Sequence, residues 1–90
     1  MYDILTKEKL NDAIYKMDIK APLIAKKARA GQFIIFRVDE TGERVPLTIA
    51  ATDKEKGSVT IIFQVLGAST KKLAAKSAGE KILDFAGPLG

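Results

Sequence analysis

Apolar and polar positions alternate with the two-residue period of β-strands over most of this chain. Tyr2–Leu10 alternates unevenly and Ala13–Ile19 more regularly, so each segment predicts a strand with one buried face. Gln32–Val38 is apolar on both faces apart from Gln32 and Arg37, which indicates a central strand. The first half of the chain is therefore expected to consist mainly of strands.

The second half continues this pattern and adds one helix. Arg44–Ala51 predicts a strand interrupted by Pro46, which cannot donate to a ladder and so marks an edge, a bulge or a gap where another group docks. Val59–Leu66 is a dense run of β-formers, after which the pattern predicts a helix from Ser69 to the segment 77–79. Lys81–Phe85 is expected to be a last short strand.

Turn-forming residues separate these elements. Asp39–Glu43 and Asp53–Gly57 predict hairpin turns, and Leu23–Ala28 predicts a loop or a single helical turn after Pro22. Gly87–Gly90 predicts a turn or linker, so we expect the chain to stop at a domain boundary. Short strands at a spacing of roughly ten residues, with a helix before the last one, predict an antiparallel barrel or sandwich.

Composition narrows the class of protein. A length of 90 residues fits one small domain, and 47% hydrophobic with 29% charged residues is the balance of a globular protein rather than a disordered or membrane one. No run approaches the roughly 18 apolar residues of a membrane span, and the N-terminal segment lacks a signal-peptide core. The expected compartment is the cytoplasm.

Two residue types are absent from the chain, which contains no cysteine and no histidine. Disulfides, thiolate nucleophiles, Cys- or His-bound metals and a Ser-His-Asp triad are therefore excluded within these residues. The net charge of +4 is modest, and its lysines and arginines fit a solvated surface better than a nucleic-acid site. No recognition-helix pattern or aromatic RNA motif accompanies them, so nucleic acid is an unexpected partner.

The stretch Ser58–Leu73 places a strand, Gly67 and a helix start in succession. The first turn of a helix has unpaired N–H groups and the positive end of the helix dipole, so a backbone brought close by glycine can hold a phosphate there. The more common explanation is that Ser69 or Thr70 is an ordinary N-cap. The stretch alone leaves both interpretations open.

Four short motifs in a fixed order carry a resemblance to a known family. They resemble the FAD-binding barrel of the ferredoxin–NADP reductase superfamily, over essentially the whole chain. The branch resembled comprises the dihydroorotate dehydrogenase electron transfer subunit and the flavin subunit of sulfide dehydrogenase or NADH-dependent ferredoxin:NADP oxidoreductase. The resemblance implies an all-β, six-stranded antiparallel Greek-key barrel with one short helix before the last strand. The motifs are Ala30-Gly31-Gln32-Phe33, Val45-Pro46-Leu47-Thr48-Ile49, Gly67-Ala68-Ser69-Thr70 and Gly87-Pro88-Leu89-Gly90.

One strand of that family carries Arg-x-Tyr-Ser/Thr, in which the arginine holds the flavin pyrophosphate, the aromatic ring packs on the flavin and the hydroxyl bonds near flavin N5. Val45, Leu47 and Thr48 fall at these positions here. Val45 cannot bind phosphate, and Arg44 points to the opposite face of the strand, so diphosphate binding is expected at the helix start instead. The resemblance gives Leu47 an apolar contact with the ring, Thr48 the catalytic position near N5, and Pro46 the place where the strand leaves its ladder.

The resemblance also places Ile62–Val65 beside the ribityl and adenosine parts of the flavin. Backbone groups would make most contacts there, while Gln64 adds an amide and Phe63 is either a packing face or plain core. The full set of cofactor-binding residues implied in this way is Pro46, Leu47, Thr48, Ile62, Phe63, Gln64, Gly67, Ser69 and Thr70.

By this resemblance, residues 1–90 are expected to form the FAD-binding part of an electron-transfer oxidoreductase subunit. Such a subunit would pass electrons between NAD(P)H and an iron–sulfur partner or ferredoxin. The nicotinamide-binding domain is expected in cis after Gly90, and a 2Fe–2S cluster on a later segment or a partner, so these residues alone would be catalytically incomplete. The competing hypothesis is a cofactor-free small barrel that binds RNA or protein.

Overall fold

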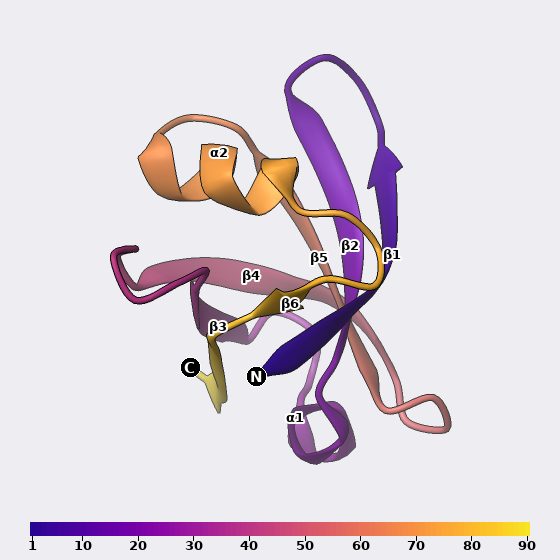
Figure 1. Cartoon of the computed structure of the whole chain (residues 1–90). Coiled ribbons are helices and arrows are strands. Elements are labelled where there is room, and N and C mark those ends of the chain that lie inside the picture. The colour runs from indigo at the N-terminus through magenta and orange to yellow at the C-terminus, as the bar shows by residue number, and fades with distance from the viewer.

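The computed structural model describes residues 1–90 and shows a small barrel of antiparallel strands with two short helices (Figure 1). The strands are β1 (Tyr2–Lys9), β2 (Ile14–Lys20), β3 (Phe33–Arg37), β4 (Val45–Asp53), β5 (Ser58–Gln64), β6 (Lys81–Ile82) and β7 (Asp84–Leu89). The helices are α1 (Pro22–Lys27) and α2 (Ala68–Ala75).

The strands follow the order β6-β1-β2-β5-β4-β3-β7 within one sheet. β6 and β7 stand at the two ends of this order but are joined in sequence through Leu83 alone. The chain therefore passes from one end of the sheet to the other at a single residue, which nearly closes the barrel. The order β2-β5-β4-β3 is a Greek key, which confirms that part of the sequence prediction.

The core lies inside this curled sheet. Alternate residues point inward, as Ile61 and Phe63 of β5 and Met17 and Ile19 of β2 do. They belong to one cluster of 17 buried apolar residues that also includes Phe36. Burying a side chain of this size contributes about 1.5–3 kcal/mol, so the alternating pattern read from the sequence is also the main source of stability.

The predictions for the end of the chain are wrong in two respects. Lys81–Phe85 does not form one strand, because the chain bends at Leu83, whose N–H donates to Val38 O at 3.1 Å. The part before the bend pairs with β1 and the part after it pairs with β3, so the barrel has seven strands and not six. Gly87–Gly90 is not a turn, since β7 continues through Pro88. β7 is the last strand in the order and has a partner on one side only, where a proline is tolerated.

Helix α1 occupies the segment predicted as a loop or a single helical turn. Pro22 stands at the first position of the helix, where a missing N–H costs nothing, and the helix buries its own residues Ile24 and Ala25. The β4–β5 turn holds this helix in place: Gly57 O accepts the Ala21 N–H at 2.9 Å, and a Cβ on Gly57 would lie 3.1 Å from Pro22.

Helix α2 differs from the prediction at both ends. Its N-cap is Gly67, so neither Ser69 nor Thr70 is the cap. It ends at Ala75, before the predicted segment 77–79, where the Ser77 N–H instead donates to the Glu80 side chain at 2.8 Å and starts a turn. Neither helix of the chain has the length and apolar content needed to cross a membrane.

Candidate functional site

A seam opens in the barrel wall where β4 changes its partner. The second half of β4 pairs with β5, and the last pair along this ladder is Ile49 with Ile61. The first half, Val45–Thr48, pairs with β3 instead. The term seam is used below for the space between Val45–Thr48 of β4 and Ile62–Gln64 of β5.

Backbone hydrogen bonds at the ends of the seam show which groups face it. Ile49 donates its N–H to the residue just before β3 at 2.8 Å, so the alternation of an extended strand turns the backbone of Pro46 toward β5. Val65 donates its N–H to the residue just before β2 at 2.8 Å, so the N–H and C=O of Gln64 face the seam from the other side. Pro46 has no N–H to offer, and no β4–β5 pair follows.

The start of α2 provides unpaired donors. The first backbone bond of the helix runs from the Lys71 N–H to Gly67 O at 2.9 Å. The N–H groups of Ala68, Ser69 and Thr70 come before it and donate to no group of the protein. The helix dipole adds positive potential at the same place, so the first turn favours an anion.

Two adjacent hydroxyls in this turn have different surroundings. The Thr70 hydroxyl accepts the N–H groups of Leu66 at 2.9 Å and Gly67 at 3.0 Å, and it donates to Gly67 O at 3.1 Å. Thr70 therefore shapes the turn between β5 and α2. The half-buried Ser69 makes no side-chain hydrogen bond within the protein, so its hydroxyl remains available to a ligand.

The seam and the start of α2 border one cavity of about 730 Å³. All nine cofactor-binding residues named from the sequence lie on its lining, although they come from β4, β5 and α2. The lining residues that are not among these nine are Thr41, Gly42, Glu43, Val45, Leu66, Ala68 and Lys72.

Thr48 lies where the main cavity meets a second hollow. A second hollow of about 390 Å³ is lined by Phe33, Pro46, Leu47 and Thr48, and the last three also line the main cavity. Pro46 and Thr48 are exposed while Leu47 is half-buried against the core. The Thr48 hydroxyl has no partner in the protein and is free to bond to a ligand that reaches both hollows.

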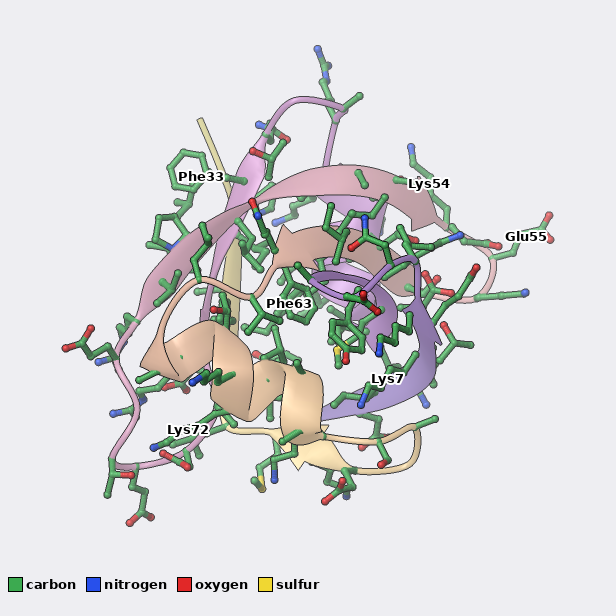
Figure 2. The ribbon with its side chains drawn as sticks, turned by 90° about the horizontal axis from the view of Figure 1, so that it is seen from above. Lys7, Phe33, Lys54, Glu55, Phe63 and Lys72 are labelled. Carbon is green, nitrogen blue, oxygen red and sulfur yellow. The ribbon has the colours of Figure 1, made fainter.

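The β5 wall of the cavity is apolar, but its residues differ in orientation. Phe63 is only 3% exposed and stacks on Tyr15 with ring centroids 6.0 Å apart, so its ring belongs to the core (Figure 2). Ile62 and Leu66 are 45% and 80% exposed, an unusual degree for large apolar side chains. These two, rather than Phe63, offer apolar surface to a ligand.

Arg44 does not contribute a charge to the cavity. Its guanidinium lies 3.4 Å from Asp84 Oδ2, which also accepts a 2.8 Å hydrogen bond from Arg37 Nε. Arg44 is not among the lining residues, whereas its neighbour Val45 is. This agrees with the expectation that Arg44 is not a simple substitute for an arginine at position 45.

Lys72 is a functional candidate that the sequence analysis missed. Its ammonium reaches from α2 to the β3–β4 loop, where it lies 3.2 Å from Asp39 Oδ1 and 3.0 Å from Thr41 Oγ1 (Figure 2). Hydrogen bonds from Thr41, and then Lys72, lower the pKa of the exposed Asp39 carboxyl below its ordinary value. The available signal was the spacing, because Lys72 follows Ser69 by three residues and shares its side of the helix.

Comparison with known proteins finds that this barrel is similar to part of an oxidoreductase and to part of an electron transfer subunit homolog, as the sequence motifs indicated. A solved chain of the NADH-dependent reduced ferredoxin-NADP oxidoreductase, described in connection with flavin-based electron bifurcation, superimposes with a TM-score of 0.97 at 40% identity. The match covers 100% of this chain and 33% of that one. No protein-family model matches the chain.

Proteins related in sequence include an electron transfer subunit homolog. The dihydroorotate dehydrogenase B (NAD(+)) electron transfer subunit homolog of Thermotoga maritima is 41% identical over 88 residues, which are 98% of this chain and 31% of that protein. An uncharacterized protein of Clostridium beijerinckii is 57% identical over 90 residues, 30% of its length. The chain is therefore similar to part of the Thermotoga maritima subunit homolog and of the oxidoreductase chain, and the resemblance is confirmed. It spans about a third of the length of the relatives that it matches.

Proposed function

We propose that residues 1–90 form the FAD-binding barrel of an electron-transfer oxidoreductase subunit. The observation that carries the proposal is the meeting of the seam with three unpaired N–H groups at the start of α2, in one cavity of about 730 Å³. An extended ligand with an anionic centre and a flat apolar end fits such a cavity. The names of the relatives support electron transfer as the setting.

The residues present fit a flavin dinucleotide part by part. The N–H groups of Ala68, Ser69 and Thr70, with the Ser69 hydroxyl, would hold the diphosphate. The seam-facing backbone of Gln64 and the exposed side chain of Ile62 would border the ribityl and adenosine parts.

The ring system would lie against the β4 side of the cavity. Leu47 and Pro46 supply apolar contact there, and the free hydroxyl of Thr48 would bond near N5. A bound flavin would supply the hydride and electron chemistry, for which the protein sets position and polarity. In this role Thr48 influences the potential of the cofactor without transferring a proton itself.

Three further elements of the proposal concern the whole protein. A nicotinamide-binding domain would follow this barrel in cis, and an iron–sulfur partner or ferredoxin would exchange electrons with it in the cytoplasm. The supporting observation is that the relatives are about three times as long as this chain and are electron transfer subunits or an oxidoreductase by name. Residues 1–90 then bind flavin but do not by themselves turn over NAD(P)H.

The test is an absorbance spectrum of the purified chain, taken after incubation with FAD and desalting. Flavin bands at about 370 and 450 nm that elute with the protein are expected. Ser69→Asp, which places a negative charge among the unpaired N–H groups, should abolish this retention, while Ser77→Asp outside the cavity should not. Equal retention by both variants would show that the flavin binds elsewhere.

A cofactor-free barrel that binds RNA is the competing hypothesis. It offers no reason for a proline at the seam or for unpaired donors beside it. A gel shift at low salt that shows tight binding of RNA by a flavin-free sample would favour it over the flavin proposal.

A further inference from the structure

The charges that line the cavity are unbalanced for a diphosphate ligand. Lys72 is the only cationic side chain on the lining, and Glu43 is the only carboxylate. Val45 stands where an arginine would be expected, and Arg44 is bound to Asp84 outside the cavity. A ligand with two negative charges would therefore find one side-chain cation within reach.

The direction of a helical side chain brings this cation to the anion site. Side chains of an α-helix lean toward its N-terminus, so the stem of Lys72 runs back along α2 toward the first turn. Lys72 lies three and four residues after Ser69 and Ala68, and therefore on their side of the helix. Both of these residues contribute unpaired N–H groups to the cavity.

From these contacts we propose that Lys72 is the cation that binds the diphosphate of a flavin dinucleotide, replacing the arginine absent at position 45, and that Asp39 holds Lys72 at the cavity mouth in the ligand-free protein. The proposal rests on the proposed function and adds the residue that distinguishes a dinucleotide from a flavin without a diphosphate.

The present partners of Lys72 can release it at little cost. Its side chain is 40% exposed and that of Asp39 is 48% exposed, a setting in which an ion pair stabilises weakly. Asp39 Oδ1 also accepts the N–H and the hydroxyl of Thr41, at 3.1 and 3.0 Å, so the carboxylate keeps two donors after Lys72 leaves. A diphosphate brings more negative charge than the carboxylate and competes well for the ammonium.

This exchange of partners predicts opposite effects for two substitutions. Lys72→Gln removes the cation and should weaken FAD binding about tenfold, the effect of one charge-assisted hydrogen bond. Asp39→Asn removes the competing anion and should strengthen FAD binding by about twofold to fivefold. Riboflavin has no phosphate, so its affinity should be the same in both variants as in the unsubstituted chain.

The experiment is a fluorescence titration of the chain with FAD and with riboflavin. Lys71→Gln is the matched control, because it removes the same charge from the neighbouring, exposed position that does not line the cavity. Lys72→Arg keeps the charge and should restore FAD affinity to within about threefold of the original. A urea unfolding curve of each variant shows whether the barrel is intact.

The outcomes separate the two proposals. An equal loss of FAD affinity in Lys71→Gln and Lys72→Gln would overturn the role of Lys72 and leave the flavin site intact. An equal loss of FAD and riboflavin affinity in Lys72→Gln would also overturn it, because the effect would then come from the tether between α2 and the β3–β4 loop. An unsubstituted chain that binds neither flavin would overturn the proposed function, and the role of Lys72 with it.

Discussion

At the scale of single residues, the hydroxyl groups of the neighbours Ser69 and Thr70 have different roles at the cavity. Thr70 uses its hydroxyl for three hydrogen bonds that fix the turn into α2, whereas Ser69 keeps its hydroxyl free. Both residues were expected to have the same role, because a serine and a threonine at a helix start look alike in a one-dimensional pattern. Only the path of the backbone decides which of the two hydroxyls forms hydrogen bonds within the protein.

The first prediction concerns Thr70. Thr70→Ala removes an acceptor for two backbone N–H groups, so it should destabilise the fold by about 1–2 kcal/mol and weaken FAD binding through a displaced turn. Thr70→Ser should restore both properties, and Ser69→Ala should lower affinity without lowering stability. Urea unfolding measures the stability of the three variants, and titration with FAD measures their affinity. Arg44→Ala is the control, because Arg44 lies outside the cavity and its loss should leave FAD binding unchanged. Equal stability of Thr70→Ala and Ser69→Ala would contradict this division.

The second prediction concerns Thr48. Its hydroxyl is free and lies where the two hollows meet, so Thr48→Ala should change FAD affinity little. Loss of one hydrogen bond near N5 should shift the flavin midpoint potential by about 10–30 mV. Spectroelectrochemical titration measures the shift, with Thr52→Ala on the same strand but away from the cavity as control. An unchanged potential would remove Thr48 from the N5 position.

At the scale of elements, the local pattern predicted where strands lie better than it predicted their partners. The segments that form β1 to β5 were all expected, because alternation and turn residues are local signals. The bend at Leu83 was missed, because Ile82, Leu83 and Phe85 read as one short apolar run. The change of partner along β4 was foreseen only as a gap at Pro46, since the partner strands are set by packing at a distance.

The third prediction tests how the β4–β5 turn holds α1. Gly57 has φ +67, which L-residues rarely adopt, and a Cβ there would approach Pro22 to 3.1 Å. Gly57→Ala should therefore destabilise the barrel by about 1–3 kcal/mol, measured by thermal or urea unfolding. Gly31→Ala is the control: Gly31 also has positive φ, but a Cβ would meet nothing within 4 Å, so only the smaller backbone term of about 1 kcal/mol remains. Equal losses in both variants would show that contact with Pro22 is unimportant.

For the molecule as a whole, the ion pair of Asp39 and Lys72 predicts a dependence of stability on pH. The pKa of Asp39 is lower in the folded protein than in the unfolded chain, so the carboxylate stabilises the fold above its unfolded pKa. This contribution is lost as pH falls through the lowered, folded pKa. The loss therefore lies on the acid side of the ordinary aspartate range and leaves neutral pH unaffected.

The measurement compares urea midpoints of the unsubstituted chain and Asp39→Asn at pH 7 and at pH 2.5. The variant should be slightly less stable at pH 7, and the difference should shrink in acid, where both chains carry a neutral group at this position. Glu40→Gln, an exposed neighbour with no ion pair, should match the unsubstituted chain at both values of pH. A difference that grows in acid would contradict the pairing.

The folded molecule as a whole also explains why the residues implied by the resemblance share one cavity, while the charged residues near that cavity were not predicted. The nine residues implied by the resemblance gather on one cavity, because their order along the chain reflects the barrel. Lys72 and the β3–β4 loop meet only in the folded molecule, since 33 positions separate Lys72 from Asp39. A pattern within one chain segment carries no sign of such a contact.

The proline at the seam has a consequence for how this barrel changes through evolution. Pro46 cannot donate a hydrogen bond toward β5, so the main chain cannot close the seam at this position whatever side chains surround it. Val45 and Leu47 can then differ from the arginine and tyrosine of the resembled motif while the opening persists. Mutations at these neighbours can therefore alter what the opening holds, while a proline at position 46 continues to keep the main chain from bonding across it.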